Sequence, residues 1–455
     1  MGDEIALQSI RGKVIQPGDS DYDTARKVYN GMIDRHPRYI IKCTDVADVI
    51  GGLRLARELN LRLAVRGGGH SGSGMGTCDD GVVIDLSPMR FVQVDVHSST
   101  ATVGGGALLG DIDHATHPFG LALPTGIIST TGIGGLTLGG GSGYLTRKFG
   151  LTIDSLLSAD IVLANGSYVT ASADENPDLF WAIRGGGGNF GIVTSFVFRL
   201  HPLTTVVGGP TLWPLDQAPA VLRWYREFLP SAPEDLNGFF VFLTVPPVPP
   251  FPAQLHNRKM CGIVWCYTGD PKKADEVFKP IATFGSPALH DVQSMPYTAL
   301  QSTFDALYPP GLQWYWKADF LNEISDEAIE RHLSFARELP SPHSTMHMYP
   351  IDGAAHRVGK SDTAFSFRTA RWSQVIVGVD PDPTNNDRLK SWARSYWNAV
   401  HPYSAGGAYV NFMMDEGVDR IMATYRDNYE RLASIKRTYD PENFFSINQN
   451  IKPVS

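Results

Sequence analysis

The sequence predicts an α+β protein in which one domain is interrupted by the insertion of a second. Helical and strand-like patterns alternate up to His201, and beyond it the chain becomes rich in aromatic residues. With 455 residues and 43% hydrophobic content, the chain is long enough to build two separate cores. We expect a first domain at 1–205, an inserted domain at 206–414 with an antiparallel sheet flanked by helices, and a return to the first domain at 415–455.

Within the first domain, apolar periodicity predicts helices at residues 21–36 and 46–59, on either side of the strand-like run R-Y-I-I-K-C. The run L-A-V-R that follows is a short apolar strand leading into a glycine loop. Alternating apolar residues predict further strands at 81–86, 91–96, 100–103, 156–163 and 192–200.

The inserted domain is expected to carry aromatic-rich strands at 238–245, 262–267 and 313–321, with helical stretches between them. The prolines of V-P-P-V-P-P-F-P, residues 245–252, stiffen a surface loop because proline fixes φ and lacks a backbone donor. Four large aromatic residues of these strands either fill a core or line a flat substrate pocket. They are Trp265, Trp314, Trp316 and Phe320.

Composition argues against several classes of partner. The formal net charge of −8 leaves no excess of Lys and Arg for nucleic acid or an anionic membrane. No apolar run is long enough to span a bilayer, and the acidic start of the chain lacks the apolar core of a secretory signal. The four cysteines include no C-x-x-C pair and are too few for a disulfide scaffold, so we expect no metal site and a cytoplasmic location.

The most informative segment is L-A-V-R-G-G-G-H, residues 63–70. Three consecutive glycines leave backbone N–H groups unshielded and allow positive φ, so the loop can wrap a pyrophosphate. Arg66 adds a positive charge beside the loop. His70 places a nucleophilic ring nitrogen at its end, which suggests a covalent bond to the ligand.

Two further glycine clusters, at 125–151 and 184–194, indicate a cofactor site, and 20 of the 46 glycines lie between Gly67 and Gly143. The alternative is a nicotinamide-binding Rossmann unit, with Asp85 as the acidic residue that binds the ribose. Against it, no clean G-x-G-x-x-G opens a helix after Val65, and a single Rossmann motif needs no further glycine clusters.

Four ordered segments resemble the berberine bridge enzyme-like flavin oxidases, which have the FAD-binding fold of the vanillyl alcohol oxidase type. They are R-G-G-G-H-S at 66–71, G-G-G-S-G-Y-L-T-R-K-F-G-L-T-I-D at 139–154, P-D-L-F-W-A-I-R-G-G-G-G-N-F-G-I-V-T at 177–194 and Y-D-P-E-N-F-F-S-I-N-Q-N-I at 439–451. The resemblance covers nearly the whole chain. It implies a two-subdomain FAD-binding domain whose flavin is covered by the sheet of the inserted domain.

Carried over residue by residue, the resemblance implies that His70 bonds the 8α-methyl carbon of the flavin. Such a bond would prevent FAD from dissociating and would raise its redox potential. The further FAD-binding residues that it implies are Arg66, Gly67, Gly68, Gly69, Ser71, Thr125, Gly126, Thr130, Thr131, Gly132, Gly134, Gly135, Gly141, Ser142, Tyr144, Gly191, Ile192, Val193, Asn411, Asn448 and Asn450.

Many members of the family form a second covalent bond through a cysteine in a segment of the form G-V-C-P-T-V-G-V-G-G. The aligned segment here is G-I-I-S-T-T-G-I-G-G, in which Ile128 replaces that cysteine. The resemblance therefore implies a single link, at His70, as in the nicotine-oxidising branch. Thr131 stands where relatives carry a residue that governs access of oxygen to the flavin.

In the family a base accepts a proton from the substrate while a hydride leaves for the flavin. The second tyrosine of the family's Y-x-N-Y segment, often that base, is replaced by Phe412. A packing or surface role is the alternative for each remaining candidate, and an amine substrate needs no base. The candidates are His356, whose ordinary pKa suits neutral pH, Tyr315 beside Lys317, Tyr144 and Tyr409.

The sequence therefore predicts an FAD-dependent oxidase of a small amine, alcohol, phenolic or sugar, with molecular oxygen as acceptor and hydrogen peroxide as product. Two alternatives stay open. One is a flavin dehydrogenase that donates its electrons elsewhere. The other is a flavin-binding module without catalysis, which the phenylalanine at 412 favours.

Overall fold

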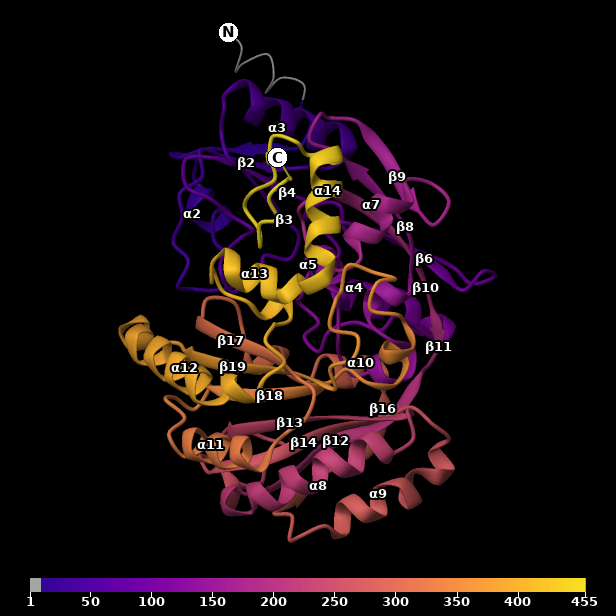
Figure 1. Cartoon of the computed structure of the whole chain (residues 1–455), viewed down its shortest axis with the longest axis vertical. Helices are drawn as coiled ribbons and strands as arrows, with labels where there is room; N and C mark the ends of the chain where they lie inside the picture. The colour runs from indigo at the N-terminus through magenta and orange to yellow at the C-terminus, as the bar shows by residue number, and fades with distance from the viewer. Residues whose placement is uncertain (1–9, 455) are drawn as a thin grey trace.

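The computed structural model describes residues 10–454, and it has an α+β fold in which two small sheets face one large antiparallel sheet (Figure 1). The expectation that the acidic start of the chain carries no secretory signal concerns residues 1–9, which lie outside the described part. Within residues 10–454, no helix has both the length and the hydropathy needed to cross a bilayer, and no three His, Cys, Asp or Glu side chains are grouped so that they could hold a metal ion.

The first sheet carries the 63–70 loop at its edge. Its strands, in spatial order, are β1 (Lys13–Ile15), β2 (Tyr39–Lys42), β4 (Val82–Asp85) and β3 (Leu63–Arg66). Because β2, β4 and β3 are parallel, their carboxyl ends share one edge, and the glycines follow β3 there. α3 (Val46–Glu58) packs against this sheet after an N-cap at Asp45, whose side chain accepts from Asp48 N.

The helix predicted at 21–36 is wrong, since only α2 (Tyr22–Ala25) is helical there. The segment that follows donates its backbone hydrogen bonds to other parts of the chain. Tyr29 N bonds Gly69 O at 3.1 Å, and Gly31 N bonds Leu312 O at 2.7 Å. Tertiary hydrogen bonds thus satisfy donors that a helix would have used, and the segment links the glycine loop to the large sheet.

The second small sheet is wholly antiparallel. Its strands, in spatial order, are β5 (Val92–Asp95), β6 (Thr100–Gly104), β10 (Ile192–Arg199), β8 (Leu156–Val162) and β9 (Tyr168–Ser172). β7 (Leu121–Ala122) and β11 (His201–Pro202) form a separate two-stranded sheet, and β11 follows β10 directly in the chain. The helices of this region are α4 (Leu109–Thr116), α5 (Ile133–Gly139), α6 (Thr146–Phe149) and α7 (Pro177–Ile183). The strands predicted in the first domain are confirmed to within two residues.

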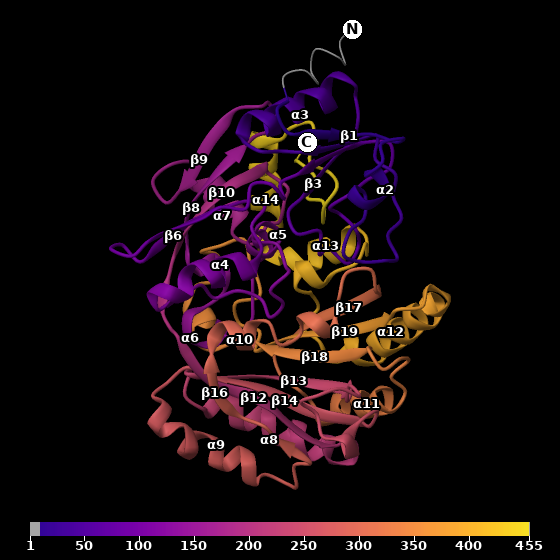
Figure 2. The same cartoon turned by 180° about the vertical axis from the view of Figure 1, so that it is seen from behind.

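The large sheet forms the middle layer of the molecule. Its main path is β15 (Leu289–His290), β12 (Thr205–Pro214), β14 (Lys259–Tyr267), β13 (Leu236–Thr244), β18 (Thr345–Pro350), β19 (Trp372–Asp380) and β17 (Gln313–Leu321), and β16 (Gln293–Pro296) pairs with β12. Figures 1 and 2 show helices on the face that points away from the small sheets. They are α8 (Ala218–Ser231), α9 (Ala274–Thr283), α11 (Asp326–Arg337) and α12 (Asn386–Val400), while α10 (Tyr297–Gln301) lies on the side of α4.

Alternation along these strands separates two cores. Trp314 belongs to the core shared with the small sheets, and its neighbour Tyr315 belongs to the core under the helices. On β18, Tyr349 faces the first core and Met348 faces the second. Every second side chain of β17, β18 and β19 therefore points toward the glycine-rich part of the molecule.

The C-terminal segment packs against the first part of the chain through α13 (Val418–Tyr425) and α14 (Tyr429–Tyr439), and Figures 1 and 2 place its end beside β3. Lys436 is fully buried and donates to Asn189 O at 2.7 Å, Phe445 O at 2.9 Å and the carboxylate of Asp440 at 2.7 Å. This cation ties the tail to the third glycine cluster. The boundaries at 205 and 414 stay predictions.

Candidate functional site

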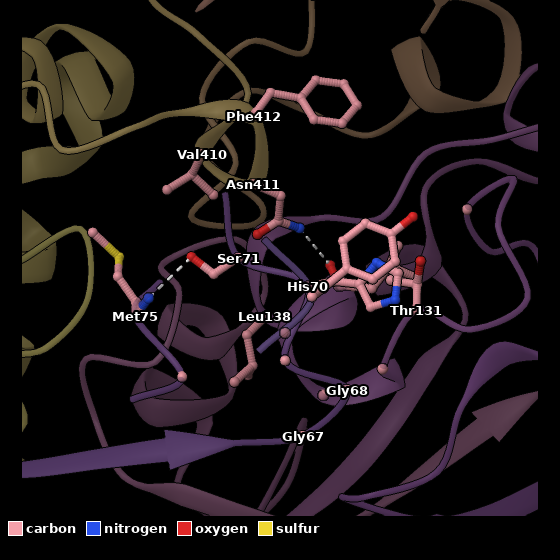
Figure 3. Close-up of a pocket in the computed structure, with 18 of the residues that line it drawn as sticks. Gly67, Gly68, His70, Ser71, Met75, Thr131, Leu138, Val410, Asn411 and Phe412 are labelled. Atoms are coloured by element: carbon pink, nitrogen blue, oxygen red, sulfur yellow. Dashed lines mark hydrogen bonds between the residues drawn. The ribbon is translucent and has the colours of Figure 1, made fainter. Parts of the chain in front are cut away.

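A cavity of about 360 Å³ lies between the glycine clusters and the large sheet, within the size range of ligand sites. All three glycine clusters contribute backbone to its wall. Figure 3 shows one side of the cavity formed by the Gly67–His70 loop and Thr131, with Val410, Asn411 and Phe412 across from it. Segments from both ends of the chain thus enclose one space.

The glycines of the cavity wall have two roles. Some let two backbone segments approach each other closely, and others leave the cavity open where a side chain would fill it. A Cβ on Gly68 would lie 2.3 Å from Gly132 N, so the first and second clusters touch backbone to backbone. At Gly135 and Gly188 an added Cβ would meet no atom within 4 Å, because the cavity itself begins there. Side chains at these positions would fill the space that a flat or phosphate-bearing cofactor needs.

Arg66 and Asp85 form a nearly buried ion pair at the base of the first loop, with Nη2 and Oδ2 2.9 Å apart. Arg66 also donates to Lys27 O. Asp85 is therefore used to neutralise Arg66 and does not line the cavity. Since no helix begins directly after β3, the Rossmann alternative is excluded.

His70 lies at the edge of the cavity with its ring held on two sides. It stacks on Tyr29, with ring centroids 3.8 Å apart and planes inclined by 19°, and its Nε2 lies 3.1 Å from Thr130 Oγ1. Burial lowers the pKa of His70 to about 4, so the ring is neutral and nucleophilic at pH 7.

The segment 409–412 fastens the second glycine cluster to the opposite wall. Tyr409 Oη accepts hydrogen bonds from Gly141 N at 2.9 Å and from Asn411 Nδ2 at 2.8 Å, and Asn411 also donates to Leu136 O at 3.1 Å. In the tail, Asn448 Nδ2 donates to Gly188 O at 3.0 Å. These contacts give both asparagine positions a structural role beside the cavity.

Most of the predicted FAD-binding residues line the cavity. They are Arg66, Gly67, Gly68, Gly69, His70, Ser71, Gly126, Thr131, Gly132, Gly134, Gly135, Ser142, Gly191, Val193, Asn411 and Asn448. The others lie behind the wall. They are Thr125, which binds Gln301, Thr130, which contacts His70, Gly141, Ile192, Asn450, which bonds Asn443, and the fully buried Tyr144.

Of the predicted bases, only Tyr409 lines the cavity. Tyr315 and Lys317 are on the opposite face of β17, because their odd positions alternate with Trp314 and Trp316, which do line it. Arg394 donates to Tyr315 Oη at 2.9 Å, and Lys317 pairs with Glu416 at 2.6 Å.

His356 lies outside the cavity on a 3₁₀ turn, with Nε2 bonded to Ala370 O at 2.8 Å. Tyr144 packs in the core beside Phe239, and its hydroxyl has no hydrogen-bond partner among the described residues. The structure therefore places His356, Tyr144, Tyr315 and Lys317 outside the lining of the cavity.

Sequence reasoning missed a group of polar and aromatic residues in the cavity wall, three of which lie on β18 of the large sheet. They are Tyr29, Phe304, Tyr308, Thr345, His347, Tyr349 and Gln449. The signal that could have found two of them is T-M-H-M-Y, in which His347 and Tyr349 alternate with methionines. The polar residues of that run share the cavity face, and the methionines face the helices.

Comparison with known proteins defines the class. Residues 37–172 match the family described as FAD binding domain, and residues 408–452 match the family described as berberine and berberine like. An FAD-linked oxidoreductase of Dictyostelium discoideum is 30% identical over 98% of this chain and 96% of its own length. The chain belongs to the berberine bridge enzyme-like FAD-linked oxidoreductases.

Two further comparisons are with nicotine-oxidising members of the family. The (R)-6-hydroxynicotine oxidase of Paenarthrobacter nicotinovorans is 30% identical over 98% of this chain and 97% of its own. The solved structure of 6-hydroxy-D-nicotine oxidase from Arthrobacter nicotinovorans superposes with a TM-score of 0.88 at 25% identity, covering 98% of this chain and 99% of that one. The fold is thus the α+β FAD-binding fold with a large antiparallel sheet in the substrate domain.

Proposed function

We propose that this protein is an oxidase whose FAD is linked through a single covalent bond at His70, and that it oxidises a small organic molecule with molecular oxygen as acceptor. The observation that carries the proposal is a neutral, oriented imidazole at the end of a bare glycine loop. Tyr29 stacks on the ring of His70 and Thr130 contacts its Nε2, so the ring is held in one orientation. A nucleophile held in this way needs little reorganisation before it forms a bond.

The cavity fits FAD by its chemistry. Backbone at Gly67–Gly69 and at Gly132–Gly135 would hold the pyrophosphate, and the open space beside Gly135 and Gly188 suits a flat ring system. When bound, the flavin supplies the acceptor for a hydride. Trp314, Trp316 and Phe412 give the cavity an aromatic wall.

A second link is not part of the proposal. Ile128 lines the cavity at the position of the family's second attachment, and its side chain has no atom that can bond the flavin. The four cysteines are buried free thiols elsewhere, and none of them lines the cavity. We also infer a cytoplasmic location, because unpaired thiols are typical of a reducing compartment.

The link is tested by acid precipitation of the wild type and of His70→Ala. The wild-type pellet should be yellow and fluorescent, and intact mass spectrometry should show the chain plus one FAD. In His70→Ala the flavin should appear in the supernatant. A colourless wild-type pellet contradicts the covalent link, and a yellow His70→Ala pellet moves it to another residue.

Oxygen as acceptor is tested by mixing the photoreduced protein with air-saturated buffer in a stopped-flow instrument. An oxidase regains its flavin absorbance within seconds and releases hydrogen peroxide. Slow reoxidation by oxygen with fast reoxidation by a quinone would instead identify a dehydrogenase. A flavin that no compound in a panel of amines, alcohols, phenols and sugars can bleach would leave only a binding module.

A further inference from the structure

The proposed reaction on a hydroxyl substrate needs a group that takes its proton, and the family's usual group is absent at Phe412. The neighbouring hydroxyl of Tyr409 is already engaged. Its oxygen accepts from Gly141 N and from Asn411 Nδ2, and in doing so it holds the second glycine cluster in place. Tyr409 therefore has a structural role in the site.

β18 supplies a different pair of side chains. His347 and Tyr349 are two positions apart, so both point into the cavity, and His347 Nδ1 lies 2.6 Å from Tyr349 Oη. The ring centroids of Tyr349 and Phe412 are 5.8 Å apart. The phenol of Tyr349 therefore lies beside the position at which relatives carry the tyrosine that Phe412 replaces. Phe239 packs against both partners, with centroid distances of 5.4 Å to His347 and 5.0 Å to Tyr349.

Both members of the pair are uncharged in this apolar setting. Burial lowers the pKa of His347 to about 3 and raises the pKa of Tyr349 above its ordinary value. A neutral imidazole keeps one ring nitrogen with a free lone pair, which can accept the phenolic proton at Nδ1. A weak base is sufficient, because a hydroxyl proton becomes strongly acidic as hydride leaves the adjoining carbon.

The wall also restricts the substrate. Among the cavity-lining residues that the structure describes, none is Asp, Glu or Lys, and the single Arg66 is neutralised by Asp85. An ammonium group would therefore find no carboxylate partner. Trp314 and Trp316 instead present flat apolar surfaces, which suit an uncharged aromatic ring.

We propose that Tyr349 and His347 form a proton relay for the oxidation of an uncharged aromatic alcohol, an inference that rests on the proposed function. Tyr349 Oη accepts the proton of the substrate hydroxyl and passes its own proton to His347 Nδ1. The electron pair of the adjoining C–H bond leaves as hydride to the flavin, and the pair of the O–H bond completes the C=O bond. The alcohol is oxidised to a carbonyl, the flavin is reduced, and the released proton rests on the imidazole.

The test measures anaerobic reduction of the flavin by three probes: benzyl alcohol, 4-methoxybenzyl alcohol and 1-phenylethanol. Tyr349→Phe and His347→Leu should lower the limiting rate of reduction by 10²- to 10⁴-fold, the usual contribution of a positioned acid or base. Binding of 4-methoxybenzyl alcohol to the dithionite-reduced protein, which cannot turn over, should weaken by less than tenfold in calorimetry. The solvent deuterium effect on reduction should be present in the wild type.

The chain provides a matched control. His332 Nδ1 and Tyr396 Oη form a second buried pair, 2.8 Å apart, in the core under the helices and outside the cavity. Tyr396→Phe removes the same kind of hydrogen bond, so it reports the cost to stability alone, and its rate of reduction should match that of the wild type.

Three results would overturn the relay: no reduction of the wild type by any of the three alcohols, rates in Tyr349→Phe and His347→Leu within threefold of the wild type, or an equal loss in Tyr396→Phe. A protein purified without flavin would overturn the proposed function itself. The yellow acid pellet therefore distinguishes the two failures.

Discussion

Asp113 shows how a single buried residue sets a pH dependence. It lies on α4 behind the cavity wall, and the only hydrogen bond of its side chain among the described residues is a long one, 3.5 Å, from Gln301 Nε2 to Oδ2. Burial raises the pKa of Asp113 to about 7. Because the unfolded chain ionises this group near its ordinary value of 3.8, folding takes up a proton between those two values.

Stability should therefore fall as pH rises from about 4 to about 7 and stay level above that. Asp113→Asn removes the ionisation and offers an amide to Gln301 Oε1, which lacks a partner. Urea unfolding at pH 8 should show the variant more stable by up to about 4 kcal/mol, with a much smaller gain at pH 5. The exposed Asp174→Asn is the control, and an equal gain at both pH values would refute the shift.

Residue identity predicted the cofactor side of the site far better than the substrate side. The glycines and His70 were found because each has a local reason to be there, a backbone approach or a nucleophile at a loop end. His347 and Tyr349 have no such local signature. Their role depends on the pairing of β18 with β13 and β19, which brings them opposite the glycine loop, and on Phe412, which follows them by more than sixty residues.

At the scale of elements, one position of register decides which side chains reach the cavity. The strand at residues 313–321 was predicted with its observed bounds, yet Tyr315 and Lys317 face the helices and the tryptophans face the cavity. Aromatic residues occupy both faces of this strand, so its sequence does not reveal which face is which. The helix predicted at 21–36 failed for a related reason, since tertiary partners at Gly69 and Leu312 compete for its backbone donors.

α14 offers an element-scale prediction about the tail. Lys436→Met should leave Asp440 buried without its cation and destabilise the protein by about 3–5 kcal/mol. It should also loosen Phe445 and the cavity-lining Asn448 and so lower the flavin content of the purified protein. Thermal unfolding and the ratio of flavin to protein absorbance measure both effects.

Arg437→Met, on the exposed face of the same helix, should change neither quantity. Lys436→Met with normal stability would show that Asp440 is satisfied by its bonds from Phe444 N and Phe445 N alone. If Lys436→Met lowered the stability but kept the full flavin content, the fold of the tail would not be needed to retain the cofactor.

At the scale of the whole molecule, buried ion pairs join the glycine-rich part to the large sheet and its loops. Arg147 Nε lies 2.8 Å from Asp352 Oδ1, and its Nη1 donates to Leu236 O. Arg368 binds Asp154 with both terminal nitrogens. Since the cavity lies between the parts that these pairs connect, occupation of the cavity and folding of the molecule should be coupled.

That coupling gives a test that needs no substrate. A freely exchanging ligand stabilises the folded state by RT ln(1 + [L]/Kd), about 1.4 kcal/mol for each tenfold rise in free ligand above Kd. His70→Ala should bind FAD without a bond, so its melting temperature should climb steadily as FAD is added. With the proposed bond, the wild type would carry its flavin into the unfolded state, so its melting temperature should not respond to added FAD. A wild-type melting temperature that rises with added FAD would mean that the cofactor exchanges freely. That result would refute the bond at His70, even if acid precipitation of the wild type gave a faintly yellow pellet.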